Sequence, residues 1–274
     1  MQISSCIVRK DIYQLVDVDG SSVRVMTRPG SRDQGHPLVL INGIGARLEM
    51  WQPFCDASFD RTIVMFDIPG ITGTPGRSFP PTMAGIAKWL TRLLDVLNIQ
   101  QPDVMGFSWG GLLAQQMARE APERVRSLVL ASTNFGFGAL HAPDALQLLH
   151  AIPGIGSDDP WVILATALGG APSILDPVEL IGNALNPATS SFIGYQYQIA
   201  ALAGWTSLPW LHEIRQPTLV IAGEDDSFIP RSTSRQLANA IPNATLTLLA
   251  AGGHLLPVNQ PQALARTVDT FLQG

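Results

Sequence analysis

The fold of this chain is decided by the stretch Gly106-Phe107-Ser108-Trp109-Gly110-Gly111. The run Pro102-Asp103-Val104-Met105 before it has β character, and Leu112 to Glu120 after it is rich in helix formers. A G-x-S-x-G pattern between a strand and a helix is typical of a sharp, strained turn that projects a serine hydroxyl from the end of a sheet. The stretch therefore predicts that Ser108 is a catalytic nucleophile.

The composition limits what else the chain can be. Its 274 residues, 46% hydrophobic and 14% charged, suffice for one large domain with a buried core. The net charge of −5 gives no electrostatic reason to expect nucleic acid or an anionic membrane as a partner. The sequence contains no run of 18 apolar residues, so it predicts no membrane span. Because the N-terminus also lacks a signal-peptide pattern, we expect a cytoplasmic protein.

Cysteine and histidine patterns give no sign of a metal. Cys6 and Cys55 are far apart and are expected to be free thiols in a reducing compartment. The sequence has no CxxC or HExxH motif. We therefore expect neither a metal nor another cofactor.

Predicted strands alternate with predicted helices along most of the chain, which indicates an α/β fold with a mostly parallel central sheet flanked by helices. The strands are expected at 13–18, 22–26, 37–41, 62–66, 102–105, 125–131, 217–222 and 244–249, and the helices at 83–97, 112–120, 232–240 and 261–272. The first two strands form a hairpin around Asp19-Gly20, a favoured turn pair. Residues 134–210 interrupt the alternation and are poor in charge, so we expect a core of 1–133 and 211–274 with a helical cap insertion at 134–210.

A serine nucleophile needs a base, and chain order suggests which residue supplies it. After a nucleophile of this kind the acid and then the histidine follow in the sequence. Only His254 comes after the strand at 217–222 and its acidic loop. In that loop Asp226 is the preferred acid, and the neighbouring Asp225 is the alternative.

Two backbone N–H groups are needed to stabilise the negative charge that develops on the substrate oxygen. One is expected from Trp109, directly after the serine, and the other from Ile44 in the loop Asn42-Gly43-Ile44-Gly45. Asn42, at the start of this loop, is also a candidate substrate contact.

The chain resembles the α/β-hydrolase family and, within it, the intracellular poly(3-hydroxyalkanoate) depolymerases of bacteria that store medium-chain-length polyesters. The resemblance rests on the segments 41–46, 108–116, 204–207 and 214–230, which include the Asn-Gly-Ile-Gly-Ala loop and Gly204-Trp205-Thr206-Ser207. Many relatives have His where this chain has Asn42; a backbone donor makes that difference tolerable. The first half of the insertion, about 135–185, matches least well. The resemblance implies hydrolysis of stored polyester to 3-hydroxy acids through an acyl-Ser108 intermediate, with a storage granule as a candidate surface partner.

Aromatic residues of the insertion are candidates for contact with an aliphatic polyester or with its granule. They are Trp161, Trp205, Trp210 and Phe192, and packing in a protein core is the alternative explanation for each.

Other functions use the same residues. A small-molecule carboxylesterase or lactonase, or a cofactor-free perhydrolase or haloperoxidase, would need the same Ser, Asp and His. A haloalkane dehalogenase is disfavoured because position 108 is not an aspartate. A ligand-sensing or granule-coating protein without turnover would have no need of all three residues.

Overall fold

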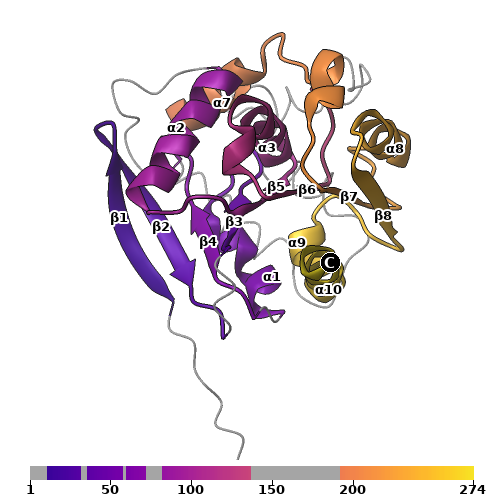
Figure 1. Ribbon diagram of the computed structural model, residues 1–274, viewed down its shortest axis with the longest axis horizontal. Coiled ribbons are helices and arrows are strands. Elements are labelled where there is room, and N and C mark those ends of the chain that lie inside the picture. Colours follow the sequence, from indigo (N-terminus) through magenta and orange to yellow (C-terminus); the bar gives the residue numbers. More distant parts are fainter. Residues whose placement is uncertain (1–10, 32–35, 58–59, 72–81, 137–191) are drawn as a thin grey trace, which may run out of the picture.

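A central sheet organises the protein in the computed structural model, which describes residues 11–31, 36–57, 60–71, 82–136 and 192–274 (Figure 1). Its strands lie in the order β1-β2-β4-β3-β5-β6-β7-β8. Their bounds are β1 Ile12–Val18, β2 Ser21–Arg28, β3 Leu38–Ile41, β4 Ile63–Phe66, β5 Asp103–Phe107, β6 Ser127–Ala131, β7 Thr218–Gly223 and β8 Ala244–Leu249. The pairs β1–β2 and β2–β4 are antiparallel and all pairs from β4 to β8 are parallel. The expected mostly parallel sheet is confirmed.

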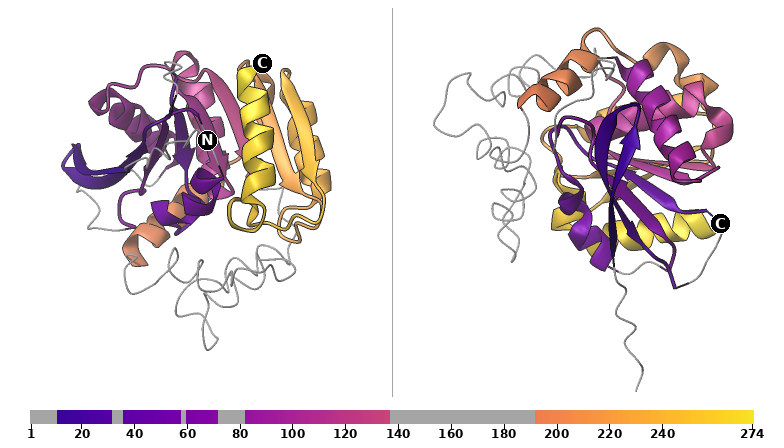
Figure 2. Two further views of the ribbon diagram at one scale, coloured as in Figure 1. Left: turned by 90° about the horizontal axis from the view of Figure 1, so that it is seen from below. Right: turned by 90° about the vertical axis from the view of Figure 1, so that its left-hand side faces the viewer.

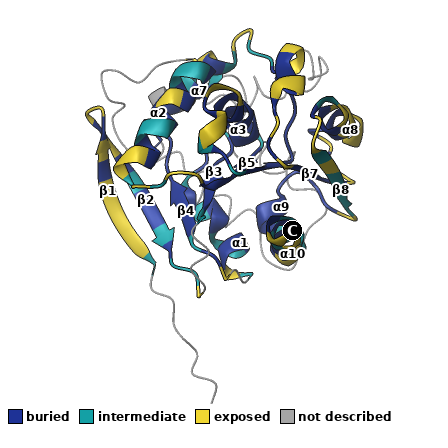
Figure 3. Cartoon of the chain, viewed as in Figure 1, coloured by how far each residue is buried: buried dark blue, intermediate teal, exposed yellow. Residues whose placement is uncertain are grey.

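The antiparallel edge is the hairpin predicted around Asp19-Gly20. Both turn residues have positive φ, 55° and 76°, as the tight hairpin turn requires. The N–H of Gly20 donates to Oδ1 of Asp17 at 3.2 Å. Strand β1 is mostly exposed, whereas the central strands are buried (Figure 3).

Helices cover both faces of the sheet. One face carries α2 (Met83–Val96), α3 (Trp109–Glu120) and α8 (Arg231–Ala240); the other carries α1 (Gln52–Asp56), α9 (Leu256–Asn259) and α10 (Pro261–Gln273) (Figure 1). Figure 2 shows α10 lying flat along the strands at the C-terminal end of the chain. Because both faces are covered, β3 and β4 are continuous apolar runs rather than alternating ones, and every residue of β5 and β6 is buried.

The remaining elements are short, apart from one helix. The 3₁₀ turns are η1 (Leu48–Trp51), η2 (Pro122–Arg124) and η3 (Leu208–Glu213), and helix α7 spans Phe192–Leu202. Helix α7 follows 137–191, which lie outside the described residues.

The two ends of the expected insertion lie side by side. The N–H of Ser207 and the hydroxyl of Thr206 both donate to the carbonyl of Phe135, at 3.0 and 2.8 Å. Gly136 forms an isolated β-bridge with Thr206. Residues 135–136 and 206–207, hereafter the neck, therefore join the two ends of the expected insertion.

Candidate active site

The loops at the carboxyl ends of the parallel strands gather the candidate residues at one edge of the sheet. Ser108 stands between β5 and α3 with φ 51° and ψ −117°, a conformation that non-glycine residues rarely adopt. Its backbone is held on both sides: its N–H donates to Ala131 O at 2.9 Å, and the Thr133 hydroxyl donates to its carbonyl at 2.7 Å. The turn predicted from sequence is thus present, with the serine at its strained point.

Glycines permit this turn because the backbone of α3 approaches so closely. A Cβ on Gly106 would lie 2.2 Å from the carbonyl oxygen of Gly110, and one on Gly110 would lie 2.3 Å from that of Ile41. Neither distance leaves room for a side chain, so the G-x-S-x-G pattern has a steric cause here.

Ser108, His254 and Asp226 form a hydrogen-bonded chain. Nε2 of His254 lies 3.1 Å from Oγ of Ser108, and its Nδ1 lies 2.9 Å from Oδ2 of Asp226. The histidine and aspartate side chains are 1% and 0% exposed, whereas Ser108 is half-buried. A neutral imidazole that donates to the carboxylate through Nδ1 can accept the serine proton at Nε2.

The second oxygen of Asp226 is also paired. Oδ1 accepts the N–H groups of Phe228 and Ile229 at 2.9 and 2.7 Å. Asp225, the alternative acid, is exposed and lies on the outside of the same turn. The structure therefore joins His254 to Asp226 and not to Asp225.

The acid and histidine loops touch through glycine. A Cβ on Gly223 would lie 1.9 Å from the carbonyl oxygen of Gly252, and the Asp225 N–H donates to that same oxygen at 2.9 Å. In the histidine loop the positive φ belongs to Ala251, at 52°. Gly252 thus allows the acid loop and the histidine loop to pack closely together. The sequence did not predict this steric requirement.

Two free backbone donors flank the serine. Among the described residues neither the N–H of Ile44 nor that of Trp109 has an acceptor. The Ile44 loop lies against the nucleophile, since a Cβ on Gly43 would be 3.7 Å from Cβ of Ser108. These are the two donors expected from sequence, and no other described group uses either N–H.

Asn42 does not face a substrate. It is fully buried; its Nδ2 donates to the carbonyls of Ala46 and Phe66 at 3.2 and 3.1 Å, and its Oδ1 accepts the Trp51 indole N–H at 2.7 Å. The expected substrate contact is corrected: the side chain is fully used in holding its own loop.

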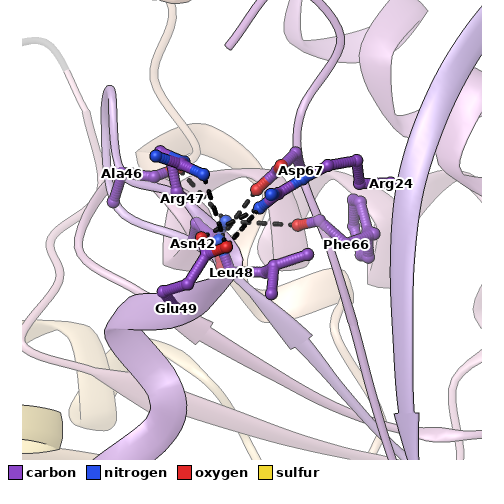
Figure 4. Close-up of polar contacts among 8 residues, drawn as sticks. All are labelled: Arg24, Asn42, Ala46, Arg47, Leu48, Glu49, Phe66 and Asp67. Carbon is purple, nitrogen blue, oxygen red and sulfur yellow. Dashed lines mark hydrogen bonds and ion pairs between the residues drawn. The ribbon is translucent and has the colours of Figure 1, made fainter. Parts of the chain in front are cut away.

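Asp67 holds the far end of this loop, as Figure 4 shows. The residue is 2% exposed. Its Oδ1 accepts the Leu48 N–H at 2.8 Å and its Oδ2 accepts Nε of Arg24 at 2.8 Å. Arg24 in turn binds both oxygens of Glu49, at 2.7 and 2.9 Å. The loop from Asn42 to Leu48, hereafter the oxyanion loop, is thus fixed at both ends.

Comparisons with known proteins agree with this geometry. The profile of the "Alpha/beta hydrolase family" matches residues 38–267. The chain belongs to the α/β-hydrolase family. It is 39% identical to a protein of Ectopseudomonas oleovorans named poly(3-hydroxyalkanoate) depolymerase, over 96% of this chain and 93% of that one. It is 30% identical to 3-oxoadipate enol-lactonase 2 of Acinetobacter baylyi, over 86% of this chain and 88% of that one. A solved hydrolase of Pseudomonas aeruginosa PA01 superposes with a TM-score of 0.79 at 27% identity, covering 97% of this chain and 99% of that one.

Two of the aromatic residues expected to contact the substrate of this hydrolase, Trp205 and Trp210, pack against each other. Trp205 donates its indole N–H to Oε1 of Gln116 at 2.6 Å and packs edge-on against Trp210, with ring centroids 5.9 Å apart. Gln116 lies about 10 Å along α3 from its start at Trp109. Trp205 therefore fastens the returning chain to α3, and its expected contact with the substrate or the granule stays a prediction. Trp161 and the side chain of Phe192 lie outside the described residues.

The described part of this hydrolase contains no cluster of three or more His, Cys, Asp or Glu side chains that could hold a metal. Within the same residues, every helix is too short or too polar to cross a bilayer.

Proposed function

We propose that this chain hydrolyses carboxylic esters through Ser108, His254 and Asp226. The observation that carries the proposal is the hydrogen-bonded chain Asp226–His254–Ser108 at 2.9 and 3.1 Å, which ends at a strained serine. His254 removes the proton as Ser108 Oγ attacks the ester carbonyl, and Asp226 stabilises the imidazolium that forms.

The negative charge that forms on the carbonyl oxygen is bound by the N–H groups of Ile44 and Trp109. Collapse of this intermediate expels the alcohol, which takes the proton from His254, and leaves an acyl group on Ser108. Water, deprotonated by His254, then releases the acid and restores the serine.

We propose further that the substrate is a poly(3-hydroxyalkanoate), cut to 3-hydroxy acids, and that the surface of its storage granule is where the protein works. The support is the 39% identity, over 96% of the chain, to the depolymerase of E. oleovorans. A small-ester or lactone substrate is the second candidate, favoured by the 30% identity to the enol-lactonase of A. baylyi.

Segment 134–210 is proposed to be the cap over the acyl group. The neck between Phe135 and Ser207 supports these limits, because it brings the two ends of the segment together.

Turnover of the two substrate classes separates the candidates. Purified protein is incubated with amorphous polyester granules of short and of medium side-chain length, and separately with p-nitrophenyl butyrate. Release of 3-hydroxy acids from granules, absent in Ser108→Ala, is the expected result. Hydrolysis of the soluble ester without any release from either granule would sink the depolymerase proposal and favour the second candidate.

A further inference from the structure

Gln198 connects helix α7 to both segments that carry the candidate oxyanion donors. Its side chain is fully buried, and its Oε1 accepts the N–H of Gly45 at 2.8 Å. Its backbone carbonyl accepts the indole N–H of Trp109 at 3.2 Å. The residue therefore sits between the oxyanion loop and the residue that follows the nucleophile.

The other end of this carboxamide is unused. Nε2 of Gln198 is buried and has no hydrogen-bond partner among the described residues. Its identity as the nitrogen follows from chemistry, because the Gly45 N–H needs an acceptor and only the oxygen can accept. A buried amide donor without a partner is destabilising, so a native protein that keeps one calls for an explanation.

We propose that Nε2 of Gln198 donates a hydrogen bond to the oxygen on the third carbon of the bound acyl group. This inference rests on the proposed hydrolysis of 3-hydroxyacyl esters at Ser108. Gln198 is then a specificity-determining residue that selects acyl groups with an oxygen at this position.

The substrate's own chemistry leads to this oxygen. The N–H groups of Ile44 and Trp109 already serve the carbonyl oxygen. The next oxygen in a 3-hydroxyacyl group is three bonds from the carbonyl carbon. Gly45, whose N–H donates to Oε1 of Gln198, directly follows Ile44, so the carboxamide is bound one residue away from a donor of the carbonyl site.

The test compares two soluble esters that differ only at this oxygen, p-nitrophenyl 3-hydroxybutyrate and p-nitrophenyl butyrate. The measured quantity is the ratio of their kcat/KM values. Gln198→Glu keeps an acceptor for the Gly45 N–H but loses the donor, and Gln198→Met loses both at similar volume. Gln196→Glu adds the same charge two residues away on α7, at a half-exposed position, and is the matched control.

The ratio is expected to fall about fivefold or more in Gln198→Glu and Gln198→Met and to stay unchanged in Gln196→Glu, since one neutral hydrogen bond is worth roughly a factor of 2 to 12. Equal losses on both esters, leaving the ratio unchanged in both Gln198 variants, would overturn the inference. Labelling of Ser108 by a phosphonate in every variant excludes misfolding as the cause. Failure of the wild type to hydrolyse either ester or granules would contradict the proposed function itself, a separate outcome.

Discussion

The oxyanion loop is held from two sides that differ in how completely their polar groups are paired. On the core side Asn42 uses both its oxygen and its nitrogen, and Asp67 binds the loop backbone and Arg24. On the α7 side Gln198 uses its oxygen on Gly45, and its nitrogen has no partner in the part of the chain that the structure describes. The difference separates two tasks: the saturated side fixes where the loop lies, and the unsaturated side has a group left for a ligand.

Among the substitutions around the oxyanion loop, removal of the Asn42 side chain should have the largest effect on activity and on stability. Asn42→Ala leaves the Trp51 indole N–H and the carbonyls of Ala46 and Phe66 buried without partners, and the Ile44 N–H loses its fixed position. We expect kcat to fall on the order of 10²-fold with little change in KM, as for loss of one oxyanion donor. The free energy of unfolding should fall by about 2–4 kcal/mol. Steady-state kinetics and urea unfolding measure the two.

Asn243→Ala is the matched control, because this exposed asparagine makes one bond to the Arg215 carbonyl, remote from Ser108 in the chain. It should leave kcat unchanged. A kcat for Asn42→Ala within threefold of wild type would show that the core side does not position the donor.

Asp67→Asn should destabilise less, because its partner Arg24 is partly solvated. The substitution removes the charge that faces the Arg24 guanidinium, whose side chain is 30% exposed. We expect a loss of about 2 kcal/mol in unfolding free energy, discounted for this exposure. Glu49→Gln, at the more exposed partner of the same arginine, should lose under about 1 kcal/mol. Equal losses in the two variants would contradict the assignment of Asp67 as the anchor of the loop.

Some regions of the structure could be predicted from the sequence and others could not. The sheet, the hairpin at Asp19-Gly20 and the turn at Ser108 follow from local patterns, because apolar runs and turn residues carry their own signal. Asn42 could not be placed from sequence, since its three partners come from separate positions in the chain. The Gly223–Gly252 contact was missed for the same reason: only the folded chain brings these two glycines together.

A substitution at Trp205 tests how the chain that follows α7 is fastened to α3, away from the reacting serine. Trp205→Phe keeps a ring against Trp210 and removes the N–H that reaches Gln116. The loss should be about 1 kcal/mol, or about 2 °C in Tm, with kcat on a soluble ester within twofold of wild type. Thermal unfolding followed by circular dichroism measures the first quantity. A large loss of kcat would support the alternative that Trp205 contacts the substrate.

The smallest effect is expected from labelling the Cys55 thiol. The labelling rate tests whether the core side of the oxyanion loop is closed to solvent. Burial raises the pKa of its thiol to about 12, so almost none is thiolate at pH 8. In a Cys6→Ser background, native protein should react with a disulfide reagent at pH 8 far more slowly than protein unfolded in urea. Equal rates in the two states would mean that the packing beneath the loop opens freely.

Covalent labelling tests the central claim most directly. Wild-type protein is treated with a serine-directed alkyl phosphonate, and the modified peptide is found by mass spectrometry while ester hydrolysis is followed in the same sample. One adduct on Ser108, appearing in step with the loss of activity and absent from Ser108→Ala, is the predicted result. An adduct on another residue, or full hydrolytic activity in Ser108→Ala, would contradict the assignment of Ser108 as the nucleophile.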